Sequence, residues 1–184
     1  LENSHKCKDE AARLRYDGVA RFFRSYFYFE KLVRFGDVPW YDKVLEMNDE
    51  GLKKARDSRK LVFQKMLEDI DFAIANCSPT KSGQRITKWT ALAFKSRICL
   101  FEGTFRKYHG LGDWEQVLEE GVKASEELIN SGVYSIHKTS ADKSYQELFI
   151  AEDAITSEII LSREYNASIP FVHSANFYIL SASY

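Results

Sequence analysis

The chain has 184 residues and a mass of 21.3 kDa, which suits one domain or a portion of a larger one. Hydrophobic residues make up 45% and aromatic residues 14%, enough apolar surface for a packed core, which excludes disordered, collagen-like and mucin-like classes. Lys and Arg number 26 against 27 Asp and Glu, so the net charge of −1 provides no overall field for gripping nucleic acid or an anionic membrane. No stretch approaches the roughly 20 apolar residues needed to cross a bilayer.

Motifs for metal binding and catalysis are missing from the sequence. Cys7, Cys77 and Cys99 match neither a disulfide framework nor the short paired spacings of zinc sites. His109 and His137 are the closest histidine pair, and neither has a second His or Cys at helical spacing. There is no nucleophile elbow, phosphate loop, dinucleotide fingerprint or zinc-protease motif. We therefore expect no metal, no cofactor and no enzymatic activity.

The first predicted element is a long amphipathic helix over about residues 11–34. Its charged residues share one face, and its apolar arc is wide enough to need more than one partner. Gly36 and Pro39 end it. The apolar set is Val19, Phe22, Phe23, Tyr26, Phe27 and Val33, and the charged set is Asp17, Arg21, Arg24 and Lys31.

Two further helices are predicted, over residues 59–76 and 88–106. Ser58 is the expected N-cap of the first, which stops before Pro79. Small residues recur along the second, and they would let another helix approach closely. These small residues are Ala91, Ala93, Ser96, Cys99 and Gly103.

A fourth helix is predicted over residues 114–131, with Asp113 as its N-cap, Gln116 completing a capping box and Gly132 closing it. Beyond Tyr134, short apolar pieces at 145–150 and 158–165 predict loops, turns and one short strand. The expected fold is all-α, a single domain over 1–184 with an irregular C-terminal segment. Its helices form two antiparallel, tetratricopeptide-type pairs, 11–34 with 59–76 and 88–106 with 114–131.

Three strings of residues, in order over about residues 10–165, carry a family resemblance. Residues 21–40 (RFFRSYFYFEKLVRFGDVPW) are similar to a signature of an aromatic helix followed by Gly-Asp-Val-Pro. Residues 83–103 (GQRITKWTALAFKSRICLFEG) are similar to a second family helix, and residues 129–134 with 148–149 and 157–161 form the third string. Together they resemble the SusD/RagB-like outer-membrane nutrient-binding lipoproteins of Bacteroidetes.

The resemblance implies an internal portion of a longer SusD-like helical scaffold. It implies a surface-exposed outer-membrane lipoprotein that binds a glycan or other nutrient without catalysis and delivers it to a SusC-like TonB-dependent transporter. Membrane attachment would then rely on a lipid anchor that is absent from this chain. The helix pairs alone would equally suit a tetratricopeptide-type scaffold for protein partners.

Four residues are candidates for ligand binding. Trp40 and Tyr41 follow a helix end in a loop, where binding residues concentrate, and flat aromatic faces match the C–H side of a sugar ring. The alternative is that they pack the exit loop onto the aromatic helix. Tyr108 and His109 lie in a loop that mixes aromatic and basic groups, which could meet a ligand or simply connect two helices.

One buried ion pair is also predicted. Glu30 falls on the apolar side of the first helix, where a carboxylate needs a cation, and Arg97 is the expected partner. The carboxylates of Glu68, Asp69 and Asp71 are expected on a solvated face, as are Glu119 and Glu120.

Overall fold

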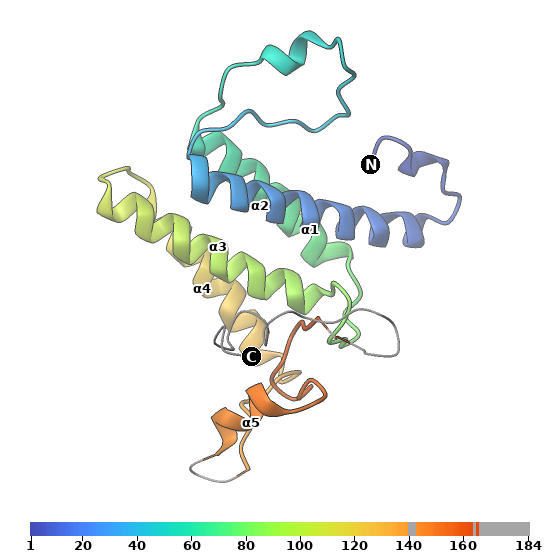
Figure 1. The fold of residues 1–184 in the computed structure, drawn as a ribbon, viewed down its shortest axis with the longest axis vertical. Coiled ribbons are helices and arrows are strands. Elements are labelled where there is room, and N and C mark those ends of the chain that lie inside the picture. The colour runs from blue at the N-terminus through green and yellow to red at the C-terminus, as the bar shows by residue number, and fades with distance from the viewer. Residues whose placement is uncertain (140–142, 164, 166–184) are drawn as a thin grey trace, which may run out of the picture.

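The computed structural model describes residues 1–139, 143–163 and 165, and their regular structure is helical (Figure 1). The four long helices form two antiparallel pairs, α1 with α2 and α3 with α4, and α2 also packs on α3. The predicted all-α fold with antiparallel pairs is confirmed. The helices are α1 (Glu10–Phe35), α2 (Arg59–Asn76), α3 (Lys88–Tyr108), α4 (Trp114–Asn130) and the short α5 (Ser144–Ile150), with 3-10 turns at Ser4–Lys6 and Glu50–Lys53.

Helix α1 begins and ends at residues with specific local chemistry. The Asp9 carboxylate accepts a hydrogen bond from the backbone N–H of Ala12 at 3.0 Å, which caps the first turn. Gly36 follows the last turn with φ of +69°, a conformation that favours glycine, and its N–H donates to the Leu32 carbonyl. The predicted end of the helix is confirmed.

The buried face of α1 differs from the predicted one. It carries Gly18, Phe22, Ser25, Phe29 and Leu32, at a spacing of three and four residues. The side with Phe23 and Phe27 is exposed instead. The predicted face was wrong because Arg21 and Arg24, which were expected to face solvent, lie against α2. Both of them pair there with Asp69.

Small residues let the helices of each pair approach closely. A Cβ on Gly18 would lie 3.0 Å from Cys77 Sγ, so α1 and α2 nearly touch there. Between α3 and α4, a Cβ on Gly103 would lie 2.5 Å from Leu118, and one on Gly121 would lie 2.9 Å from Cys99 Cβ. The prediction that the small residues of α3 permit close packing is confirmed at Cys99 and Gly103.

The helix starts agree with the sequence at one position and differ at another. The Ser58 hydroxyl caps α2 by accepting from Leu61 N–H, as predicted. The predicted capping box at Asp113 is wrong: this residue is left-handed, with φ of +63°, and its carboxylate pairs with Lys60 of α2. The capping box lies instead at α3, where the side chains of Thr87 and Thr90 each bond the other's backbone N–H.

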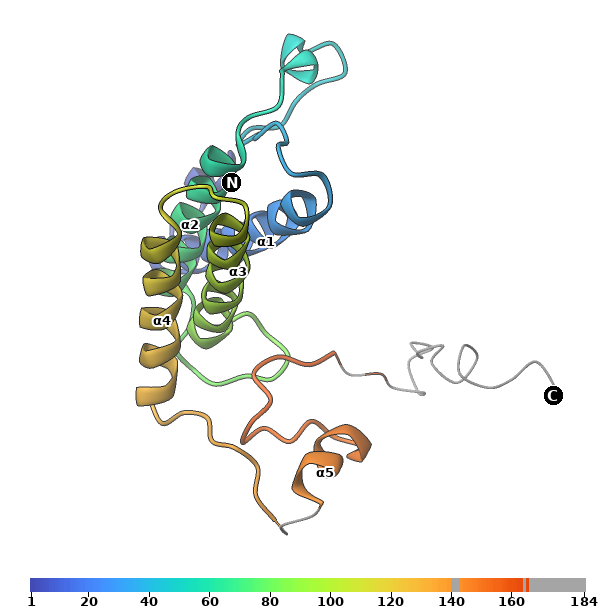
Figure 2. The same ribbon diagram turned by 90° about the vertical axis from the view of Figure 1, so that its left-hand side faces the viewer.

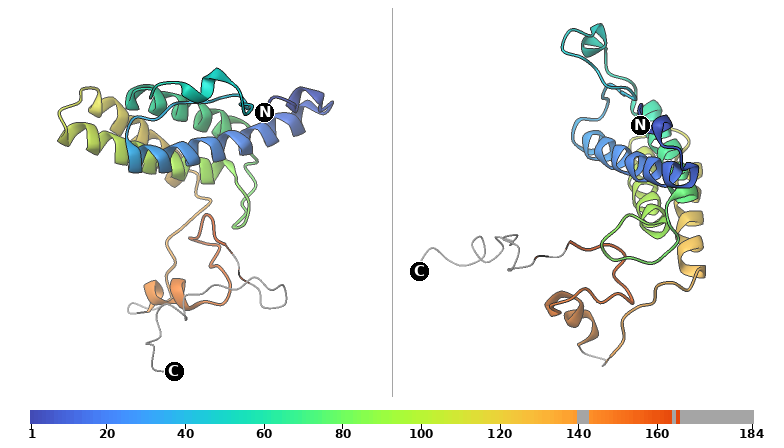
Figure 3. Two further views of the ribbon diagram at one scale, coloured as in Figure 1. Left: turned by 45° about the horizontal axis from the view of Figure 1, so that its top comes forward. Right: turned by 90° about the vertical axis from the view of Figure 1, so that its right-hand side faces the viewer.

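Two irregular segments leave the bundle on opposite sides. The loop between α1 and α2 extends from one end of the bundle, and residues 38 and 57 form a β-bridge at its base (Figure 2). The segment that contains α5 lies on the other side (Figure 3). Residues 145–150, predicted as loop or strand, are helical, and residues 158–163 form no strand. Residues 164 and 166–184 lie outside the described part of the chain.

The core lies between the long helices. Val62, Met66 and Ile70 of α2 are fully buried, and Ile98 and Cys99 of α3 pack with them. None of the helices among the described residues combines the length and apolar composition required to cross a membrane.

Candidate functional site

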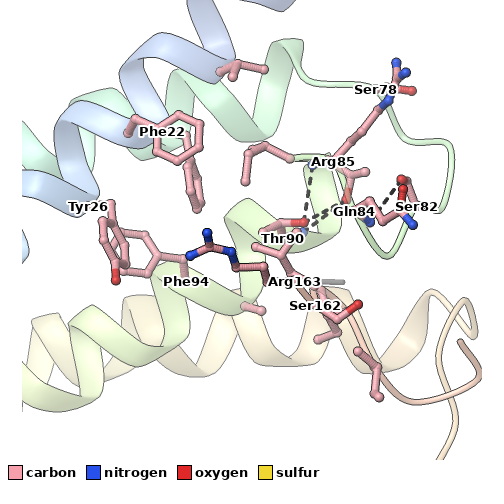
Figure 4. A pocket seen from close by; sticks show the side chains of 18 of the residues that line it. Phe22, Tyr26, Ser78, Ser82, Gln84, Arg85, Thr90, Phe94, Ser162 and Arg163 are labelled. Atoms are coloured by element: carbon pink, nitrogen blue, oxygen red, sulfur yellow. Dashed lines mark hydrogen bonds between the residues drawn. The ribbon is translucent and has the colours of Figure 1, made fainter. Parts of the chain in front are cut away.

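An open cleft of about 1780 Å³ lies between residues 15–26 of α1, the first half of α3, the loop before α3, and residues 148–149 and 158–163. Figure 4 shows Phe22, Tyr26 and Phe94 on one side of it, with the loop residues Gln84 and Arg85 on the other. Its volume is above the roughly 300–1,000 Å³ that is typical of concave small-ligand sites, so it has room for an extended ligand. The cleft is therefore the main candidate for ligand binding in the described part of the chain.

The apolar wall of the cleft comes largely from α1. Tyr16, Phe23 and Tyr26 line it and are 65%, 53% and 46% exposed. The centroid of the Tyr26 ring lies 5.5 Å from that of Phe94 on α3, and the Phe22 centroid lies 5.3 Å from the Phe94 centroid. Aromatic residues from two helices thus present partly accessible flat surfaces to one space.

The opposite wall is held in place by hydrogen bonds to backbone carbonyls. Ser162 N–H donates to the Gly83 carbonyl at 2.7 Å, which ties the C-terminal segment to the loop before α3. Trp89 Nε1 donates to the Pro79 carbonyl at 2.7 Å and holds the other end of that loop. Hydroxyls and an amide line this side, from Ser78, Thr80, Ser82 and Gln84.

The charged residues that line the cleft are mostly arginines. Arg15, Arg85, Arg97 and Arg163 contribute four cations against one carboxylate, Glu158. A Glu158 oxygen already accepts the backbone N–H of His137 at 2.6 Å. The lining is therefore positive although the chain as a whole has a net charge of −1.

Trp40 and Tyr41 lie away from this cleft and are integrated into the bundle. Trp40 is only 8% exposed, and its ring centroid lies 4.2 Å from that of Tyr28. Tyr41 N–H donates to the Tyr28 hydroxyl at 2.7 Å, and its own hydroxyl donates to the Gly51 carbonyl. Burial raises the pKa of Tyr28. This geometry favours the alternative reading of Trp40 as a residue that packs the exit loop.

Tyr108 and His109 lie at the C-terminal end of α3, and they do not line the cleft. Tyr108 is 83% exposed, while the His109 ring contacts Phe105 with centroids 4.1 Å apart. Arg59 lies over the same Phe105 ring, with its Cζ 3.7 Å from the ring centroid. Ligand binding by Tyr41, Tyr108 and His109 stays a prediction.

The structure corrects the expected partner of Glu30. Its carboxylate lies 2.8 Å from Nη2 of Arg34, one turn along α1, and remains partly exposed. Arg97 is exposed and lines the cleft. The prediction assumed that the apolar side of α1 is buried. The side that carries Phe23 and Tyr26 is exposed, so Glu30 reaches solvent without a partner from α3.

The buried charges lie elsewhere and join different helices. Asp69 is 2% exposed and pairs with Arg24, which corrects its assignment to a solvated face. Glu102 accepts from Arg59 at 2.7 Å and from Arg106 at 2.8 Å. These carboxylates are paired within the bundle and belong to the scaffold.

A third charged group joins three helices. Lys95 Nζ lies 2.8 Å from carboxylate oxygens of Asp71 on α2 and Glu120 on α4. The hydrogen bonds from Lys95 and Lys123 lower the pKa of Glu120 to about 2. Across the described part of the chain, His, Cys, Asp and Glu side chains form no group of three or more that could hold a metal ion.

The cleft residues were missed by sequence reasoning except for one signal. The apolar arc of residues 22–29 was too wide for one partner, and two of its members, Phe23 and Tyr26, form part of the exposed aromatic wall. The sequence did not indicate a cluster of arginines, because Arg15, Arg85 and Arg97 lie far apart in the chain and on separate elements.

Comparison with known proteins identifies relatives of this chain. A family described as "Starch-binding associating with outer membrane" matches residues 1–98, more than half of the chain. A SusD-like protein, P38, of Formosa agariphila is 26% identical over 140 residues, which are 76% of this chain and 25% of that protein.

Solved structures show the same fold. A SusD-like protein from Bacteroides fragilis superimposes with a TM-score of 0.69 at 28% identity, covering 85% of this chain and 28% of that one. A protein crystallised with xylogluco-oligosaccharide gives a TM-score of 0.70 at 22% identity, covering 90% and 32%. The chain thus spans about a quarter to a third of the length of these relatives. The family model covers residues 1–98, and the helical fold agrees with that of a SusD-like structure. This chain therefore belongs to the SusD-like family, described as starch-binding and associating with the outer membrane.

Proposed function

We propose that this protein binds a glycan without chemical conversion, at the outer-membrane surface, and that the open cleft is a binding surface. The observation that carries the proposal is the aromatic wall of Tyr16, Phe23 and Tyr26, which is accessible within a 1780 Å³ cleft. Partly exposed aromatic rings suit the C–H face of a pyranose, while the hydroxyls and the amide of the opposite wall suit its hydroxyl groups. The structural relative crystallised with xylogluco-oligosaccharide supports a glycan as the ligand class.

Delivery to a SusC-like TonB-dependent transporter completes the proposed function. It rests on family membership, since the family associates with the outer membrane. Attachment would be through a lipid anchor, as a surface-exposed lipoprotein. A protein that passes its cargo on must also release it, so the expected dissociation constant is micromolar to millimolar, or about 4–8 kcal/mol of binding free energy.

The first experiment is a glycan-array screen of the full-length protein, followed by calorimetry on each hit. Phe23→Ala removes an exposed ring of the cleft, and we expect it to weaken saccharide binding at least about fivefold. Tyr108→Ala removes an even more exposed ring outside the cleft and serves as the matched control. Circular dichroism checks that both variants remain folded.

Each result of this screen has a definite meaning. Loss in Phe23→Ala with normal binding in Tyr108→Ala supports the cleft. The reverse pattern would move the site to the end of α3, where Tyr108 and His109 lie. Failure of every saccharide to bind would contradict the proposed function.

A scaffold for protein partners is the second candidate. The observation that favours it is an exposed strip on α1 beyond the cleft, where Lys31 Nζ lies 5.1 Å and 5.6 Å from the ring centroids of Phe27 and Phe35. Exposed apolar strips of this kind often bind protein. Co-purification of the full-length protein with its transporter, abolished by Phe27→Ala with saccharide binding retained, would assign this strip to that contact.

A further inference from the structure

We infer that the cleft selects acidic saccharides, those that carry carboxylate or sulfate groups, over neutral ones. This inference rests on the proposed glycan-binding function and names its ligand class. It is carried by the cations that line the cleft and by the scarcity of carboxylates near them.

Three arginines in the cleft form no ion pair within the described residues. Arg15 comes from α1, Arg85 from the loop before α3 and Arg97 from α3, and all three are exposed. Arg15 is held beside the aromatic wall, with Cζ 5.2 Å from the centroid of Tyr16. Three separate elements thus contribute arginines to the lining of one cleft.

These arginines contrast with those of the scaffold. Arg24 pairs with Asp69, and Arg59 and Arg106 both pair with Glu102, so each of these guanidinium groups between the helices has a carboxylate partner. In the cleft the one lining carboxylate, Glu158, lies within hydrogen-bond distance of a backbone N–H. Since the whole chain carries a net charge of −1, the positive cleft is a local feature and not a consequence of composition.

The residue types in the cleft divide the work of recognition. A guanidinium presents a planar fork of N–H groups that donates to two oxygens of a carboxylate or sulfate at once, which makes arginine well suited to oxyanions. The rings of Tyr16 and Phe23 offer flat apolar surfaces for a sugar ring next to those forks. A neutral sugar would use the rings and the hydroxyls and amide of the opposite wall, whereas an acidic sugar would use the arginines as well.

The test is a panel of matched saccharide pairs bound to the full-length protein. Oligogalacturonate and oligoguluronate are each compared with their methyl-esterified forms, and a sulfated galactan is compared with its desulfated form. We expect each bound acidic member to bind at least about tenfold more tightly than its neutral counterpart. Raising NaCl from 50 to 500 mM should reduce this difference, because salt screens exposed charges.

Variants then locate the effect. Arg97→Gln and Arg15→Gln should each weaken acidic binding about tenfold and weaken neutral binding by a much smaller factor, while Arg97→Lys should restore part of the acidic binding. Arg56→Gln removes an exposed arginine on the α1–α2 loop and is the matched control. Acidic preference that persists in the Arg15 and Arg97 variants would overturn the assignment to this cleft.

The failure of this inference is distinct from failure of the proposed function. Neutral members that bind as well as their acidic partners, or better, would overturn the acidic preference and leave glycan binding intact. Binding of no member, acidic or neutral, here and on the wider array, would contradict both.

Discussion

Arg24 of α1 and Asp69 of α2 form a two-pronged ion pair, with Nε and Nη2 of the arginine each 2.6 Å from a different carboxylate oxygen. Arg21 adds a second cation 3.6 Å from the same carboxylate. The pair joins the two helices of the first hairpin, and it does so at a position that is almost fully buried.

Asp69→Asn should lower the free energy of unfolding by about 3 kcal/mol, since it removes a buried carboxylate and leaves two partly buried arginines without their shared counter-charge. Urea denaturation followed by circular dichroism measures this change. Glu68→Gln, at the exposed neighbouring position, is the control and should change stability by less than about 1 kcal/mol. Equal small losses in both variants would show that the pair contributes little.

Trp40→Ala should destabilise the fold by about 3–5 kcal/mol, because it empties a large buried site against Tyr28. Tyr108→Ala should change stability by less than about 0.5 kcal/mol, because its side chain is exposed. Chemical denaturation followed by far-ultraviolet circular dichroism compares the two. A stable Trp40→Ala variant with reduced saccharide affinity would contradict the packing role and restore Trp40 as a binding residue.

Gly121→Ala tests the close approach of α3 and α4. Its new Cβ would lie 2.9 Å from Cys99 Cβ and 3.5 Å from the Ser96 carbonyl oxygen, so the helices must move apart. We expect a loss of about 1–3 kcal/mol even though alanine favours helix. Gly112→Ala adds the same methyl group where no atom lies within 4 Å, so its effect on stability should be nearly neutral. The melting temperatures of the two variants test this difference.

The group around Lys95 predicts a loss of stability in acid. The folded-state pKa of Glu120 is about 2, below its ordinary value of 4.5, so its contribution is present above about pH 5 and is lost as the pH falls toward 2. Glu120→Gln should be less stable than the natural protein at pH 7 and should lose less stability between pH 5 and pH 2. Melting temperatures measured across this range test the expectation. Glu119→Gln, exposed on the same helix, should leave the profile unchanged, and parallel profiles for all three proteins would contradict the assignment.

Some of the candidate site could be anticipated from sequence. The excess of aromatic residues over 22–29 predicted a surface in need of a second partner, and that surface is one wall of the cleft. The other walls could not be anticipated. Arg97 was paired with Glu30 by a helical-wheel argument, which assumes that an apolar arc is covered, and α1 leaves part of its arc open.

The sequence by itself determined where the helices lie and that they form antiparallel pairs. Helix bounds follow from local chemistry, such as the Ser58 cap and the Gly36 stop, and from periodic burial within about 20 residues. Family membership was also visible there, because it depends on ordered strings of residues. Only the tertiary structure decided which side of α1 is covered, which charges meet and where the cleft opens. Arg24 meets Asp69 across 45 residues, and Ser162 meets Gly83 across 79. Such contacts depend on how helices pack over long separations, which no local periodicity specifies.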